Sequence, residues 1–115
     1  MAEFVIGDVV ILTFPFSDLS GSKKRPGLVI GIPDDRHLIL AQITSKSYHD
    51  NLVILLEADC FIEGSLPVQS FIRPGKIFTA SSELILYKAG SVITDIRQKV
   101  HLELLKICDY TRSKF

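Results

Sequence analysis

A run of three consecutive cations, Lys23, Lys24 and Arg25, is the part of the sequence best suited to chemistry. The Arg25 guanidinium can grip a phosphate through two parallel hydrogen bonds and stabilise charge that develops on it, whereas a lysine acts only as a point charge. Pro26 follows directly and biases Arg25 toward an extended backbone, which holds the guanidinium in place. We therefore expect a binding site for a polyanion in this loop, which begins at Gly21 and leads into an apolar strand.

Two predicted strands bring a second polar group to the same place. Apolar runs at residues 27–32 and 37–44 flank a turn signal at residues 33–35, and this pattern predicts an antiparallel hairpin. Because the two strands of a hairpin run in opposite directions, their outer ends, Arg25 and Thr44, reach the same edge of the sheet. The pairing makes Thr44 a candidate, since a strand-end threonine is otherwise explained by a hydrogen bond to a neighbouring backbone group.

The residues around this pair have two interpretations each. Lys23 and Lys24 either position a phosphate or are simply solvated. Ser45 and Lys46 can line the same groove, although an ordinary polar turn explains them equally well. Phe16 flanks the basic run and is free either to stack on a nucleic-acid base or to pack in the core.

The rest of the pattern indicates a mainly β fold with a C-terminal helix, arranged as a small curled sheet or barrel. Strands are also expected at residues 4–14 and 52–56, and in one strand at 68–72 and 76–79 that is broken by a bulge at Pro74 and Gly75. The run at 84–87 fits a strand or a helix.

The helix is expected to start at an N-cap, Thr94, with Asp95 in its first turn. Every fourth residue after that is apolar, which predicts one packed face flanked by Leu105 and Ile107. The residues of that face are Ile96, Val100, Leu104 and Cys108.

Composition limits the classes of function. The chain has 115 residues, which predicts a single domain over 1–115, and its 13 Lys and Arg balance 13 Asp and Glu. That balance excludes the strongly basic field of a non-specific nucleic-acid binder, so phosphate binding must be local. Cys60 and Cys108 are too few for a disulfide framework and have no zinc-site spacing, so we expect free, mostly buried thiols and no metal. Neither a leader peptide nor a membrane span is recognisable, which predicts a cytoplasmic protein away from membranes.

In order and spacing, these signals resemble the MazF/PemK family of toxin endoribonucleases from bacterial toxin–antitoxin pairs. The resemblance implies an SH3-like barrel, a homodimer, no cofactor, and metal-independent, sequence-selective cleavage of single-stranded RNA. It also implies attack of the RNA 2′-hydroxyl on the adjacent phosphate, and inhibition by an acidic antitoxin. The residues that carry it lie at 7–10, 15–18, 24–30, 43–46 and 76–79, and in the C-terminal helix.

By this resemblance Arg25 and Thr44 are the catalytic residues, Arg25 supporting the charged transition state and Thr44 bonding to the reacting phosphate. Some members use an Arg and an Asp two residues apart on a later strand. Arg73 matches that Arg, but Gly75 stands in place of the Asp. The RNA-binding residues are then expected to be Lys23, Lys24, Ser45, Lys46, Arg73 and Phe16.

Two other classes of function stay open at this point. A toxin of the same fold that binds DNA gyrase would need neither Arg25 nor Thr44. A non-catalytic SH3-like module that binds RNA or a peptide would fit the missing acidic residue at Gly75.

Overall fold

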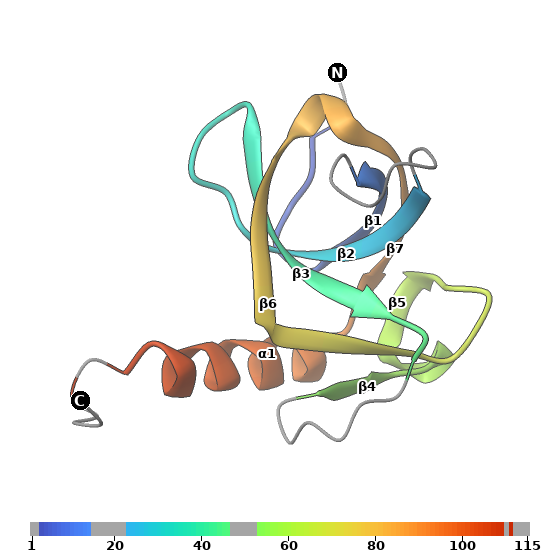
Figure 1. The fold of residues 1–115 in the computed structure, drawn as a ribbon. Helices are drawn as coiled ribbons and strands as arrows, with labels where there is room; N and C mark the ends of the chain where they lie inside the picture. The colour runs from blue at the N-terminus through green and yellow to red at the C-terminus, as the bar shows by residue number, and fades with distance from the viewer. Residues whose placement is uncertain (1–2, 15–22, 47–52, 110, 112–115) are drawn as a thin grey trace.

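The fold is a single curled antiparallel sheet with one helix packed beneath it (Figure 1). The computed structural model describes residues 3–14, 23–46, 53–109 and 111. The sheet has seven strands in the order β4-β6-β3-β2-β1-β7-β5. The strands are β1 (Asp8–Phe14), β2 (Lys23–Gly31), β3 (His37–Thr44), β4 (Ile54–Leu56), β5 (Phe61–Gly64), β6 (Ser70–Ser81) and β7 (Ile85–Val92). Helix α1 spans Thr94–Ile107, and short 3₁₀ turns lie at Ala58–Cys60 and Ser82–Leu84. The expected mainly β fold with a C-terminal helix is therefore confirmed.

Strand β6 is the longest strand, with 12 residues, and it pairs with two neighbouring strands. It pairs with β3 along its length and with β4 through its first residues, and Figure 1 shows it bending sharply between these parts. The register with β3 slips at the bend: Ala41 lies opposite Ile77, but Gln42 lies opposite Arg73. The extra residues include Pro74, which cannot donate a ladder hydrogen bond. The bulge predicted at Pro74 and Gly75 is thus confirmed.

Strand alternation divides the core into two clusters on opposite faces of the sheet. Consecutive residues fall into different clusters: Val9 and Leu28 belong to the first, and Val10 and Val29 to the second. Both sides are apolar because both sides are covered. The first cluster comprises Val9, Leu28, Ala41, Ile43, Leu56, Ile72, Val92, Ile96 and Val100. The second comprises Val10, Leu12, Val29, Leu38, Leu40 and Ala80.

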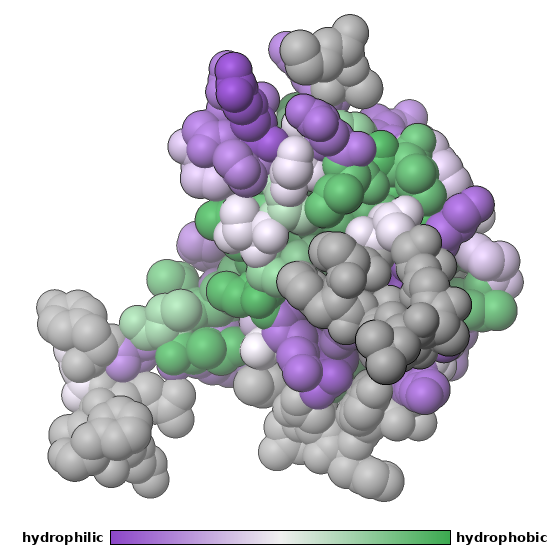
Figure 2. All heavy atoms as spheres, turned by 45° about the horizontal axis from the view of Figure 1, so that its top comes forward, coloured by the Kyte–Doolittle hydropathy of each residue, from purple (hydrophilic) through white to green (hydrophobic). Residues whose placement is uncertain are grey.

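Helix α1 docks through the early part of its length. Ile96 and Val100 are buried in the first cluster, and Leu104 packs partly against it. Farther along, hydrophobic side chains gather on the surface of the helix, namely Leu102, Leu105 and Ile107 (Figure 2). The apolar face predicted for this helix is therefore too broad.

Two details at the ends of the helix correct the sequence prediction. The N-cap is Ile93, not Thr94, and it caps without a side-chain hydrogen bond. Thr94 is the first helical residue, and its hydroxyl accepts a hydrogen bond from Arg97 Nη2 at 3.2 Å. At the other end Cys108 follows the helix and is exposed, so the expectation of two mostly buried thiols is wrong for this one. Both cysteines are free.

A polar cluster ties together three neighbouring strands of the sheet. The buried carboxylate of Asp8 in β1 accepts hydrogen bonds from Ser91 Oγ at 2.7 Å and from the Val5 backbone N–H at 2.9 Å. Lys88 Nζ in β7 lies 3.8 Å from Asp8 Oδ1 and 2.9 Å from Glu63 Oε1 in β5. The hydrogen bond from Lys88 lowers the pKa of Glu63, and the same contact, helped by the charge of Asp8, raises the pKa of Lys88.

Several strand limits differ from those expected. The strand 37–44 is correct. Of the run at 84–87, residues 85–87 belong to β7, whereas Leu84 ends the second 3₁₀ turn. The basic run, however, does not lie in a loop, because β2 begins at Lys23 and pairs with β1 through it. Strand β1 starts at Asp8 after a turn, and β5 was not predicted at all.

Candidate functional site

The ends of β2 and β3 enclose an open pocket of about 350 Å³. Six of the eight residues predicted from the sequence line it. The full lining is Lys23, Lys24, Arg25, Pro26, Gln42, Ile43, Thr44, Ser45 and Lys46. The pocket joins two separate stretches of the sequence, 23–26 and 42–46, which the predicted hairpin brings together.

The register of β2 with β3 explains why these residues meet. Leu28 lies opposite Ala41 and Gly27 opposite Gln42, so continuing the same register brings Arg25 opposite Thr44. The hairpin predicted from the two apolar runs is therefore correct. The pocket lies at the polar end of the hairpin, away from the turn that joins the two strands.

The site continues a face of the sheet that is apolar elsewhere. On the β1 side Arg25 lies opposite Leu12, a member of the second core cluster. On β3 the residues of that face run Leu38, Leu40, Gln42 and Thr44, from buried to half-buried. The polar groups of the pocket thus stand at the end of a packed core, which is a rigid support for binding groups.

Exposure divides the cations into two kinds. Lys23, Lys24 and Lys46 are exposed, whereas Arg25 is half-buried. An exposed ammonium attracts an anion through a screened field, while a partly desolvated guanidinium interacts more strongly with charge beside it. The arrangement suits a polyanion whose charges approach the lysines and whose reacting group lies near Arg25.

The Thr44 hydroxyl already has one local partner. Its Oγ1 accepts a hydrogen bond from the Lys46 backbone N–H at 3.2 Å. This is the structural role anticipated for a strand-end threonine. The hydroxyl still has its own proton to donate, so it can support the turn and bind an anionic oxygen at the same time.

Arg73 lies behind the pocket rather than among the residues that line it. From β6 it faces β3, and its Nη1 donates to Gln42 Oε1 at 3.3 Å. Its contact with the pocket is this hydrogen bond to Gln42, a lining residue that the sequence prediction missed. The signal for Gln42 was available: it is a polar residue at a position where alternation with Leu38 and Leu40 predicts a core residue.

Phe16 lies outside the described residues, so its stacking role stays a prediction.

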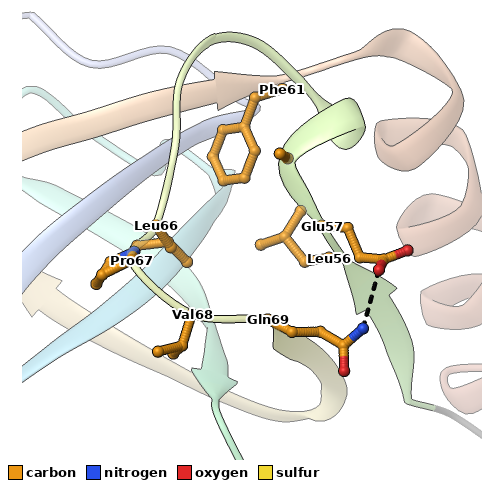
Figure 3. Close-up of a pocket in the computed structure, with 8 residues that line it drawn as sticks. Leu56, Glu57, Phe61, Leu66, Pro67, Val68 and Gln69 are labelled. Atoms are coloured by element: carbon orange, nitrogen blue, oxygen red, sulfur yellow. Dashed lines mark hydrogen bonds between the residues drawn. The ribbon is translucent and has the colours of Figure 1, made fainter.

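Three other hollows among the described residues have linings of a different kind. A pocket of about 240 Å³ between β4 and the segment before β6 is lined mainly by apolar side chains, among them Leu56, Phe61 and Leu66 (Figure 3). At its edge Gln69 Nε2 donates to Glu57 Oε2 at 2.9 Å. This pocket can accept an apolar group but offers little chemistry.

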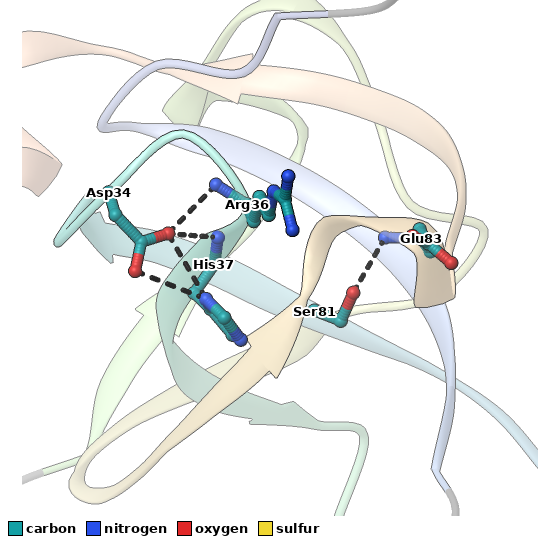
Figure 4. Close-up of polar contacts among 5 residues, drawn as sticks. All are labelled: Asp34, Arg36, His37, Ser81 and Glu83. Carbon is teal, nitrogen blue, oxygen red and sulfur yellow. Dashed lines mark hydrogen bonds and ion pairs between the residues drawn. The ribbon is translucent and has the colours of Figure 1, made fainter.

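The far end of the β2–β3 hairpin is acidic rather than basic. Asp34 Oδ1 accepts from the backbone N–H groups of Arg36 and His37, each at 2.8 Å, and His37 Nδ1 lies 3.1 Å from it (Figure 4). The backbone hydrogen bond from Arg36, followed by that of the His37 ring, lowers the pKa of Asp34. The turn expected at residues 33–35 is confirmed, and an anion would avoid this end.

Within 3–14, 23–46, 53–109 and 111, no group of three or more His, Cys, Asp or Glu side chains is placed to hold a metal ion. Helix α1, the one α-helix in the same ranges, is too short and too polar to cross a membrane.

Proteins similar to this chain are found among solved structures. No protein-family model matches the chain, and no curated protein matches it either. Among solved structures, an endoribonuclease in complex with its cognate antitoxin from a mycobacterial species superposes with a TM-score of 0.73 at 11% identity, over 96% of this chain and 99% of that one.

Two further solved structures have a similar fold. MazF in the MazE–MazF complex of Deinococcus radiodurans gives a TM-score of 0.71 at 16% identity, over 88% of this chain and 92% of that one. Mycobacterium tuberculosis toxin MazF-mt6 gives a TM-score of 0.70 at 14% identity, over 89% of this chain and 96% of that one. This chain therefore has the fold of the MazF toxins, over nearly its full length.

Proposed function

We propose that this chain, as a single domain over residues 1–115, is an endoribonuclease toxin of the MazF/PemK type that cleaves single-stranded RNA at selected sequences. The observation that carries the proposal is the pocket in which Lys23, Lys24 and Lys46 surround the half-buried Arg25 and Thr44. The shared fold with solved endoribonucleases supports the same conclusion.

The proposed reaction uses a nucleophile that the substrate provides. The RNA 2′-oxygen forms a bond to the adjacent phosphorus, and the bond from phosphorus to the 5′-oxygen breaks. The 2′-hydroxyl loses its proton to solvent, and the departing 5′-oxygen takes up a proton. The products are a 2′,3′-cyclic phosphate and a 5′-hydroxyl. Because the nucleophile is held next to its target, positioning and charge stabilisation supply most of the catalysis, and no metal is needed.

Each group of the pocket has a role in this scheme. Arg25 binds the non-bridging phosphate oxygens and stabilises the charge that builds up on them. Thr44 donates its hydroxyl proton to one of those oxygens. Lys23, Lys24 and Lys46 hold the flanking phosphates and set the position of the strand.

The proposed partners follow from the same surface. A solved neighbour of this fold is an endoribonuclease in complex with its cognate antitoxin. A local basic pocket on a chain of zero net charge suits an acidic antitoxin segment that covers the RNA site. We further propose a homodimer that works in the cytoplasm, as the family resemblance implies.

The test compares the natural protein with Arg25→Ala on a mixed-sequence single-stranded RNA in EDTA. Removing one preorganised donor of this kind costs about a hundredfold to a thousandfold in rate. Cyclic-phosphate and 5′-hydroxyl ends are expected from the natural protein and should be largely lost in the variant. Arg36→Ala is the matched control, because Arg36 is an exposed arginine at the opposite end of the hairpin.

Intact RNA after incubation with folded, antitoxin-free protein would refute the proposal. RNA binding without cleavage would then identify a non-catalytic binding module. Inhibition of DNA gyrase would identify a gyrase-directed toxin of the same fold.

A further inference from the structure

We infer that the side-chain amide of Gln42 is a third hydrogen-bond donor for the phosphate that Arg25 and Thr44 bind, and that Arg73 positions this amide. The inference rests on the proposed function, since it assigns the pocket to a phosphate of RNA. Gln42 lines the pocket, whereas Arg73 does not. The direct RNA contact predicted for Arg73 from the sequence is thereby replaced by an indirect role.

Gln42 lies within reach of a group bound by Arg25 and Thr44. On β3, Gln42 and Thr44 are two residues apart, so they share one face of the sheet and their Cα atoms are about 7 Å apart. On β2, Gly27 lies opposite Gln42, which makes Arg25 the diagonal neighbour of Gln42. Diagonal neighbours are about 7–8 Å apart, a distance that long side chains can bridge. Arg25, Gln42 and Thr44 also line the same pocket, so one anion can contact all three.

A hydrogen bond determines which way the Gln42 amide faces. The register shift in β6 sets Arg73 opposite Gln42, and Arg73 Nη1 donates to Gln42 Oε1 at 3.3 Å. A guanidinium carries only donors, so the amide turns its oxygen, and not its nitrogen, toward Arg73. In the part of the chain that the structure describes, no acceptor is found for the Gln42 amino group. Its N–H groups are therefore what Gln42 offers to a ligand in the pocket.

An anionic oxygen is the ligand that suits this amino group. Gln42 and Arg73 are both half-buried, and hydrogen bonds are electrostatically stronger where the local dielectric is low. The hydrogen bond that Gln42 accepts from Arg73 polarises the amide, which makes its N–H groups better donors. Glutamine and asparagine amides held in a fixed orientation can stabilise charge that develops in a transition state. Gln42 is thus placed to meet the charge on the phosphate together with Arg25.

Two substitutions of Gln42 test the donor role through the rate of RNA cleavage. Gln42→Ala removes the donor, so kcat should fall by about tenfold to a hundredfold, with a smaller change in KM. Gln42→Glu keeps the shape but presents only acceptors and a negative charge to the phosphate, so its kcat should fall at least as far. Gln98→Glu is the control for added charge, because Gln98 is exposed on α1.

A double-mutant cycle tests the positioning role of Arg73. Arg73→Met removes the hydrogen bond to Gln42 Oε1 and should lower kcat in the natural background, while Arg73→Lys, which keeps a donor, should recover part of the rate. In the Gln42→Ala background, Arg73→Met should cause little further loss, because Arg73 acts through Gln42. Melting curves establish that each variant is folded. Losses that multiply would show that Arg73 acts on the RNA independently, and would overturn its positioning role.

A spectroscopic readout tests the same donor without any cleavage. In ¹⁵N-labelled natural protein, the side-chain amide signals of Gln42, assigned by their absence in Gln42→Ala, should shift on titration with inorganic phosphate, together with the Arg25 Nε–H signal. In Arg73→Met the shift of the Gln42 amide should be smaller.

The two readouts separate the inference from the proposed function. A Gln42 amide that does not respond to saturating phosphate would overturn the inference, as would a natural kcat in Gln42→Ala, even if the natural protein cleaves RNA. A phosphate-dependent shift of the Gln42 amide in a folded protein that leaves RNA intact would refute the proposed RNase and support the donor role of Gln42.

Discussion

At the scale of single residues, the Thr44 hydroxyl has a structural role, and the proposed function gives it a chemical role as well. The Lys46 N–H donates to its oxygen, so the remaining proton must point elsewhere. A hydroxyl that is already held needs little reordering to bind an anionic oxygen, and such preorganisation is where most electrostatic catalysis arises.

Thr44→Val and Thr44→Ser separate these roles. Valine keeps the shape and removes the hydroxyl, so cleavage of a defined RNA should slow by about a hundredfold or more. Serine keeps the hydroxyl and should stay close to the natural rate. Steady-state rates report the effect, and melting curves report the lost hydrogen bond to Lys46, worth about 1 kcal/mol. A valine variant that cleaves at the natural rate would remove Thr44 from the mechanism.

At the scale of elements, the strands show how far the sequence could be read. The hairpin of β2 and β3 follows from apolar runs and a turn signal that lie close together. The extension of β2 through Lys23 and Lys24 does not, because it is imposed by pairing with Phe14 and Thr13 on another strand. Strand β5 has only four residues, and one of them is a glycine, so its pattern is too short and too weak to recognise as a strand.

The same reasoning applies to the candidate site. Arg25 and Thr44 were predictable because the hairpin sets their positions, and family resemblance pointed to the same pair. Gln42 was not selected, since its contact with Arg73 arises from the register shift in β6 that places Arg73 opposite it. Contacts that depend on long-range register cannot be read from local pattern alone.

The pairing of β5 with β7 depends on two glycines that face each other. Gly64 has φ +71°, and a Cβ there would overlap the carbonyl oxygen of Ala89; a Cβ at Gly90 would overlap that of Glu63. Gly64→Ala and Gly90→Ala should each lower the free energy of unfolding by about 1–3 kcal/mol in urea titrations. Gly27→Ala is the control, because its Cβ would meet its neighbours at 3.5 Å or more. Equal stability of all three variants would contradict this account.

The polar cluster at β1, β5 and β7 predicts a pH dependence. The pKa of Glu63 is lowered, so its contribution to stability is present above the ordinary value of 4.5 and is lost as the pH falls through the folded-state value. The pKa of Lys88 is raised, so its contribution is present below 10.5 and is lost as the pH rises through the folded-state value. Both contributions are complete near neutrality.

Lys88→Met should therefore lower the melting temperature most near neutral pH, where it leaves the buried Asp8 without its cation. The difference from the natural protein should shrink in acid, as the Glu63 carboxylate becomes protonated. Melting temperatures from pH 3 to pH 8 give the comparison. A melting-temperature difference that stays constant across this pH range would show that the ion pairs of Lys88 do not cause the difference.

At the scale of the whole molecule, charge is balanced overall and concentrated locally. The chain has zero formal net charge, but three lysines and an arginine line one pocket while the opposite end of the hairpin is acidic. Binding of a polyanion should depend on a few contacts rather than on the total field.

Salt dependence measures the number of those contacts. The logarithm of RNA affinity should fall linearly with the logarithm of salt concentration, with a slope of about 0.7 for each phosphate contact to a single strand. Lys24→Ala should reduce the slope by about that amount, and Lys99→Ala, on the exposed side of α1, should leave it unchanged. Anisotropy titrations at several salt concentrations provide the slopes. Affinity that does not respond to salt would contradict a basic RNA pocket.

The order of the strands in the sheet has a consequence for how the protein is made. Strand β1 lies between β2 and β7, so Asp8 pairs with Ser91 near the other end of the sequence. The strands that form the pocket are synthesised early, yet the support beneath them is incomplete until β6 and β7 have emerged. Assembly must therefore wait for late residues, which slows folding. A nascent chain that stops before Ile85 would expose the apolar edge of β1, so aggregation or degradation is the expected fate of incomplete products.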